Sequence, residues 1–175
     1  MTPLIANAGL PMLIPQIVLM AFAFLPVVLI EFALMRKSMA ISFPKGFVDV
    51  GVANLYTTLI GVPIAWSAML AMNIFMSGIY KYGTDSPVQM LITVTLQAAW
   101  LWPYKDHLFW MIPAASTILL IPCFFVSVLM ESYVLTKRWP SQKRHEVFSS
   151  VLRANLWSYL FLLAGGSYWF FNRVL

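Results

Sequence analysis

The chain has few charged residues and a single cysteine. Only 10% of its 175 residues are charged, whereas 61% are hydrophobic. A soluble globular protein with this composition could not cover its surface with polar side chains. The composition therefore excludes a soluble domain and predicts an integral membrane protein. Cys123 has no second cysteine to pair with, so no intrachain disulfide can form, and we interpret it as a small packing residue.

Motifs for catalysis and for cofactor binding are also lacking. The two histidines, His107 and His145, fall in predicted loops on opposite sides of the membrane, and no Cys or His pair has metal-ligand spacing. No glycine-rich phosphate loop, nucleophile elbow or Ser/His/Asp set can be assembled. The sequence therefore favours a non-enzymatic protein and predicts neither a cofactor nor a metal site.

Four apolar stretches are each long enough to cross a bilayer. A helix needs about 20 apolar residues for this, and we place the four helices at roughly 12–35, 50–76, 109–135 and 152–171. The predicted fold is all-α, with a first transmembrane hairpin at 1–78, an extracytoplasmic connection at 79–108 and a second hairpin at 109–175.

The basic residues predict the orientation of the chain, because Lys and Arg in short loops stay on the cytoplasmic side. Eight of the 11 basic residues lie in or beside the two hairpin loops: Arg36, Lys37, Lys45, Lys137, Arg138, Lys143, Arg144 and Arg153. The other three, Lys81, Lys105 and Arg173, fall on the opposite side. We therefore expect both termini to be extracytoplasmic, in a bacterial inner (plasma) membrane. The positive charge indicates contact with anionic lipid headgroups and requires no nucleic acid.

The connection between the hairpins contains a predicted helix. Ser86 is a candidate N-cap, Pro87 suits the first helical position and Gln89 completes a capping box. We expect about 15 helical residues, ending before Pro103 and too few to span the bilayer. A polar stripe on this helix indicates that it lies in the outer interface or packs over the bundle; the stripe comprises Gln89, Thr93 and Gln97.

Tryptophans cluster around the end of this connection. Trp100, Trp102 and Trp110 have the composition of an interfacial aromatic belt. The alternative is a ligand-binding aromatic box.

One pattern occurs twice along the chain, in the two predicted hairpins. A glutamate deep in an apolar helix is followed by basic residues and then by Ala-Asn-Leu-aromatic-hydroxyl at the start of the next helix. The first copy contains Glu31, Asn54 and Thr57, and the second contains Glu131, Asn155 and Ser158. Because each glutamate and asparagine are equally far from their loop, we expect them to meet at one depth, which indicates a duplicated hairpin.

Two interpretations of these polar groups remain open. Each Glu-Asn pair can clamp its own hairpin, with the hydroxyls as additional partners and with Arg36, Lys37, Lys137 or Arg138 folding back toward the carboxylate. Alternatively, the pairs face each other across a pseudo-twofold axis and form a site for a proton, a cation or a polar headgroup. In addition, Ser67 and Ala71 provide small-xxx-small spacing, which joins helices to one another or to a partner protein.

The segment from Glu31 to Gly61 resembles hairpins of many small uncharacterised bacterial membrane proteins. It also resembles the first hairpin of the cyanobacterial filament-integrity FraC family, which is linked to cell-cell septal junctions. The resemblance covers about thirty residues, rests on the Glu, basic turn and Asn-Leu-aromatic-hydroxyl pattern, and does not extend to the second copy.

Together these features predict a non-enzymatic accessory or scaffolding subunit of a larger membrane assembly, whose partners are lipid and either other membrane proteins or further copies of itself. The alternative is a small transporter or channel with a polar path through the bilayer. Glu31, Asn54, Glu131 and Asn155 would line that path.

Overall fold

The computed structural model describes residues 9–80, 82–102 and 107–174, with side chains up to residue 171. Lys81, Lys105 and the side chain of Arg173, which were used to predict the orientation, lie outside the described part. Four helices are long and apolar enough to cross a membrane. The elements in chain order are β1 (Leu10–Pro11), α1 (Leu13–Met39), α2 (Phe43–Tyr56), the π-helix η2 (Thr57–Gly61), α3 (Val62–Ser77), α4 (Pro87–Leu96), β2 (Trp100–Leu101), α5 (Leu108–Arg138) and α6 (Arg144–Val174).

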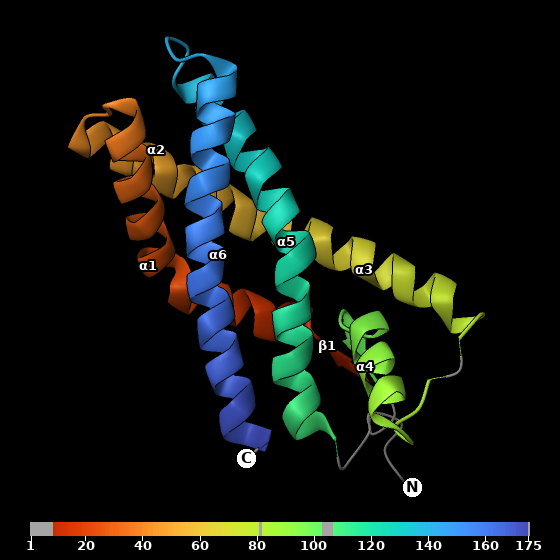
Figure 1. Ribbon diagram of the computed structural model, residues 1–175. Helices are drawn as coiled ribbons and strands as arrows, with labels where there is room; N and C mark the ends of the chain where they lie inside the picture. The colour runs from red at the N-terminus through yellow and green to blue at the C-terminus, as the bar shows by residue number, and fades with distance from the viewer. Residues whose placement is uncertain (1–8, 81, 103–106, 175) are drawn as a thin grey trace, which may run out of the picture.

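The bundle is built from two hairpins that pack side by side (Figure 1). Within each hairpin the helices are neighbours, α1 with α2 and α5 with α6. Between the hairpins α1 contacts α6 and α2 contacts α5, so the four helices form a closed ring. At the end that carries the hairpin loops, the ring encloses a core cluster that includes Met35, Val50, Leu135 and Val151.

The helices begin and end at residues with the expected local chemistry. Ala40 ends α1 in the left-handed conformation, at φ 52° and ψ 41°. Ser42 is extended and Pro44 lies in the first turn of α2, where its missing N–H costs nothing. The predicted start of the second helix at residue 50 was late, because the polar segment before it is also helical and buries Asp49. The other spans also extend several residues beyond the predicted ends.

The second transmembrane helix is continuous through α2, η2 and α3, which together form a helix of 35 residues. Beyond η2 it diverges from the bundle, and α3 runs away from α5 toward one side of the molecule (Figure 1). Only 17% of its most apolar 18-residue window is buried, against 44% for α5 and 39% for α6. Most of α3 therefore faces outward.

The connection between the hairpins folds over the opposite end of the bundle. Ser86 caps α4 as predicted, accepting a hydrogen bond from the Gln89 backbone N–H at 3.2 Å. The helix is shorter than predicted and ends at Leu96, because the turn that follows is held by tertiary bonds. The Ala99 carbonyl accepts from Trp66 Nε1 at 2.7 Å and from the Met12 backbone N–H at 3.0 Å. A two-residue antiparallel pairing of β1 with β2 follows, which the sequence did not indicate.

The polar stripe of α4 faces the protein. Thr93 is fully buried and its hydroxyl donates to the Gly83 carbonyl at 2.9 Å, while Gln97 is 5% exposed. Because α4 contacts α3 and α5, it packs over the bundle, which was one of the two predicted placements. Trp100 belongs to β2, Trp102 is exposed and Trp110 Nε1 donates to His107 Nδ1 at 3.2 Å. Their proposed position in a membrane interface stays a prediction.

The close approach of η2 to α5 depends on Gly61. A Cβ atom at this position would lie 3.0 Å from Met130 Sδ and 3.1 Å from Val126 Cγ1. We expect Gly61→Ile to force the helices apart and to destabilise the bundle by about 1–3 kcal/mol. Thermal denaturation of the purified protein in detergent measures the effect. The control is Gly165→Ile in α6, where an added Cβ meets no atom within 4 Å; equal loss in both variants would contradict this role of Gly61.

Candidate functional site

Two carboxyl groups lie together inside the ring of four helices. Glu31 is fully buried and Glu131 is 1% exposed. Asn54 Nδ2 donates to Glu31 Oε2 at 2.6 Å, and Asn155 Nδ2 donates to Glu131 Oε2 at 2.7 Å. The predicted pairing of each glutamate with the asparagine of its own hairpin is therefore present. Both donors are carboxamides, which carry no charge, so neither bond neutralises a carboxylate.

The hydroxyl groups of Ser158 and Thr57 each hydrogen-bond to the glutamate of the opposite hairpin. Ser158 Oγ, in the second hairpin, donates to Glu31 Oε1 at 2.6 Å. Thr57 Oγ1, in the first hairpin, donates to Glu131 Oε1 at a longer 3.5 Å. Each glutamate is thus bound by the asparagine of its own hairpin and by the hydroxyl of the other. The sequence identified all six residues, but it did not indicate this exchange.

The backbone of the second and fourth transmembrane helices orients these donors. Each asparagine also donates to the carbonyl one turn earlier, Asn54 to Val50 and Asn155 to Val151, both at 3.2 Å. The residue before each asparagine is a fully buried alanine, which lets the helices approach closely. Thr57 begins η2, and a π-helix turn of this kind often marks a functional site.

A small cavity adjoins the site on the side of Glu131. Its volume is about 20 Å³, enough for one water molecule. On its wall the hydroxyls of Ser127 and Tyr159 hydrogen-bond to each other at 2.7 Å. The other lining residues are Met20, Phe24, Val27, Asn54, Thr57, Thr58, Val62, Glu131 and Leu162. The site therefore has space for a water molecule or a small ion and no room for an organic substrate.

The basic residues in and beside the hairpin loops contact groups other than the two buried glutamates. The guanidinium of Arg36 lies over the ring of Phe43 and the ammonium of Lys137 over the ring of Tyr133, each at 5.7 Å. Lys143 lies 3.5 Å from the exposed Glu146. None of the basic groups in the described part of the chain reaches either buried glutamate, so the contacts expected from folded-back cations are not formed.

An ion pair that the sequence analysis missed joins the hairpins near the loops. Arg138 Nη1 lies 2.7 Å from Asp49 Oδ1, and Trp139 Nε1 donates to Asp49 Oδ2 at 2.7 Å. Asp49 is 2% exposed. It was overlooked because the predicted helix began one residue after it. The available signal was a lone acidic residue less than two helical turns before the Asn-Leu-aromatic motif.

Gln16 of α1 is a second buried polar residue that the sequence analysis missed. It is 1% exposed, and neither atom of its carboxamide has a partner among the described residues. The Oδ1 atom of Asn155 is likewise unpaired within the described ranges.

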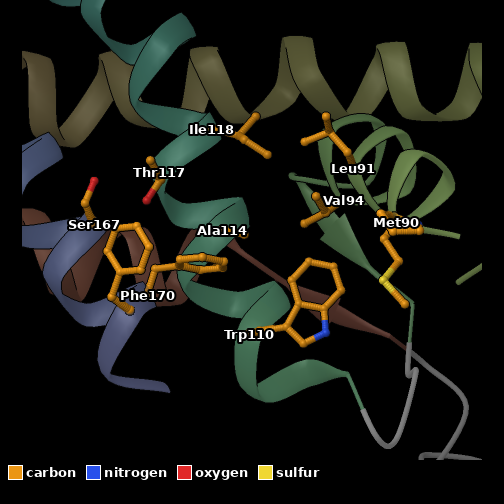
Figure 2. A pocket seen from close by; sticks show the side chains of 11 residues that line it. Met90, Leu91, Val94, Trp110, Ala114, Thr117, Ile118, Ser167 and Phe170 are labelled. Carbon is orange, nitrogen blue, oxygen red and sulfur yellow. The ribbon is translucent and has the colours of Figure 1, made fainter. Parts of the chain in front are cut away.

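A larger groove lies far from the glutamates, between α4, the start of α5 and the end of α6 (Figure 2). Its volume is about 550 Å³. Met90, Trp110 and Phe170 point toward it, and Thr117 and Ser167 are the polar residues of its lining. This groove offers an apolar contact surface, and it brings no set of acids, bases or nucleophiles together.

Over the described ranges, no three or more His, Cys, Asp or Glu residues come together in a way that could hold a metal ion. Comparison with known proteins adds no relative: no family model matches the chain, and no curated protein or solved structure matches it either.

The ion pair at Asp49 gives a prediction about stability. Asp49→Ala removes the buried partner of Trp139 and of Arg138, whose side chain is 39% exposed and can still reach water. We expect a loss of about 1–3 kcal/mol. The matched control is Glu146→Ala, which removes an exposed ion pair and should change stability by less than about 0.5 kcal/mol. Thermal denaturation in detergent distinguishes the two, and equal melting points would contradict the ion pair's structural role.

Proposed function

We propose that this chain is a multi-pass protein of a bacterial inner membrane and acts as a non-enzymatic accessory or scaffolding subunit of a larger membrane assembly. In this proposal the chain consists of two duplicated hairpins with both termini extracytoplasmic. The matching Glu-Asn bonds of the two hairpins support the duplication. The basic residues of both hairpin loops support a cytoplasmic position for that end of the bundle.

The observation that carries the proposal is an unpartnered packing face on α3. Ser67 and Ala71, the small-xxx-small pair, are both exposed, and Gly78 continues the same line two turns further on. They lie on the side of the helix opposite the buried Val62 and Ala65. Small residues in membrane helices allow two backbones to approach closely and are enriched at helix-helix interfaces. Within the described chain, this face packs against no other helix.

Large apolar side chains flank this line of small residues. Ile64, Ile74 and Phe75 are 51%, 65% and 68% exposed. The small residues form the floor of a shallow furrow, and these large side chains form its two sides. A ridge of side chains on a second helix fits into such a furrow. We propose that the helix in this furrow belongs to a partner membrane protein, with a second copy of this chain as the other source of such a helix.

Filling the bottom of this furrow with a larger side chain tests the proposal. We expect Ala71→Leu to release the chain from its native complex while leaving the isolated bundle folded, because Ala71 is exposed on the surface of α3. The measurement is the mass of the particle purified from its native membrane in a mild detergent. The control is Ala33→Leu, at an exposed alanine of α1. A native particle that holds only one copy of this chain, or one unchanged by Ala71→Leu, would contradict the proposal.

A second candidate function is a small transporter or channel that uses the intramembrane polar site. The observation that favours it is that Glu31 and Glu131 are both buried inside the ring of helices, and that each accepts a hydrogen bond from a hydroxyl group of the other hairpin. Buried carboxyl groups of membrane helices take up and release protons in proton relays. The neighbouring cavity of about 20 Å³ would supply the water or small cation that exchanges with such a proton.

Removing one charge distinguishes this candidate from a structural clamp. Glu31→Gln keeps an acceptor for Asn54 but cannot release a proton. In proteoliposomes with a pH-sensitive dye, a proton carrier should lose its flux at least tenfold with unchanged expression, because a general proton-relay group is removed. A clamp should show no flux in either form and nearly native stability. Glu146→Gln, at an exposed position, is the control for the charge change.

A further inference from the structure

We propose that a pocket between α1 and α6, at the end of the bundle that carries the hairpin loops, binds the phosphate headgroup of an anionic phospholipid. This inference is independent of the role proposed above, because it concerns neither the packing face of α3 nor the buried glutamates. It is carried by the charges, the hydroxyls and the apolar wall of one pocket.

The pocket has a volume of about 330 Å³ and is lined by residues of two helices from different hairpins. Lys37 and Ser38 come from the last turn of α1, and Ser150 and Arg153 come from α6. Leu34 and Trp157, about one turn further from the loops, complete the lining. The pocket therefore has a basic, hydroxyl-bearing side and an apolar side, which follow one another along the helices.

The two basic side chains of the pocket form no ion pair with the described part of the chain. Arg153 Nε donates to the Ser149 carbonyl at 3.2 Å, a bond that carries no compensating charge. None of the acidic side chains in the described part of the chain pairs with Lys37 or Arg153. Two positive charges thus line one pocket, and none of the described residues provides a counter-ion for them.

The other seam between the hairpins shows how the chain satisfies such a position internally. Arg138 and Ser38 each lie 7 residues after the glutamate of their own hairpin, so they occupy equivalent positions. Asp49 and Ser150 each lie 5 residues before the asparagine of their own hairpin and are equivalent in the same way. At the α2–α5 seam these positions hold the ion pair of Arg138 with Asp49 at 2.7 Å. At the α1–α6 seam they hold two hydroxyls that hydrogen-bond to each other at 2.7 Å. The carboxylate that closes one seam is absent from the other, which leaves room and positive charge for an external anion.

The apolar side of the pocket identifies this anion as part of a lipid. Trp157 is 59% exposed and Leu34 is half-buried, so an acyl chain can lie against them while the phosphate contacts the basic side chains. Basic pockets between transmembrane helices on the cytoplasmic side are suited to anionic headgroups, and arginine and lysine both bind phosphate well. A soluble phosphate would use only the polar half of the site.

Binding of lipid to the purified full-length chain tests the proposal. Native mass spectrometry in a mild detergent, titrated with phosphatidylglycerol or phosphatidylcholine, counts the bound lipids. We expect one tightly bound phosphatidylglycerol and no comparable phosphatidylcholine. Changing both Lys37→Gln and Arg153→Gln should weaken phosphatidylglycerol binding about tenfold or more. The matched control changes Lys143→Gln and Arg144→Gln, which removes the same charge from two exposed residues, the last of the loop and the first of α6.

The remaining arms separate this pocket from other sources of binding. Ser150→Asp supplies the carboxylate that the seam lacks and should abolish tight phosphatidylglycerol binding even if the double variant folds poorly. If the control variant weakens lipid binding as much as the pocket variant does, binding is due to general electrostatic attraction by all the basic residues near the loops. The pocket would then not be a specific lipid site. If inorganic phosphate at millimolar concentration displaces the lipid fully, the site recognises free phosphate, which would overturn the assignment to a lipid.

Discussion

The structure depends on the need to satisfy two glutamates inside a bilayer-spanning bundle, where water cannot hydrogen-bond to them. Each carboxyl group takes one donor from its own hairpin, an asparagine, and one from the other hairpin, a hydroxyl. Neither hairpin can satisfy its own glutamate alone. The exchange therefore fixes the two hairpins relative to each other in depth and in rotation, in a way that non-directional packing of apolar side chains does not.

The two seams between the hairpins are closed by different chemistry. One carries the ion pair of Asp49 with Arg138, supported by the indole of Trp139, and the other carries the hydrogen bond of Ser38 with Ser150. Both lie near the hairpin loops, on the same side of the glutamates. The ion pair neutralises the charge of Arg138, whereas none of the acidic side chains within the described ranges pairs with Lys37 or Arg153 beside the two hydroxyls. One seam is thus closed by an ion pair, and the other is the seam at which we propose that a lipid phosphate binds.

The outer surface of the bundle differs from its centre, where the polar side chains hydrogen-bond to one another. Below η2, α3 diverges from the ring and turns small and bulky apolar residues outward, while α4 fills part of the space it leaves (Figure 1). The proposed roles are accordingly divided: the glutamates hold the bundle together, α3 offers a face to another helix, and the α1–α6 seam offers a headgroup site.

The sequence by itself determined the class of protein, the four spans and the two Glu-Asn pairs, because these follow from apolar length and from spacing along regular helices. Only the tertiary structure decided which hydroxyl binds which glutamate, since that choice depends on the rotation of one hairpin against the other. It also decided the early start of α2, the early end of α4 and the burial of Asp49, each of which is set by a partner far away in the chain. Contacts along one helix follow a fixed period that can be counted, whereas contacts between helices depend on packing, which no spacing within the sequence encodes.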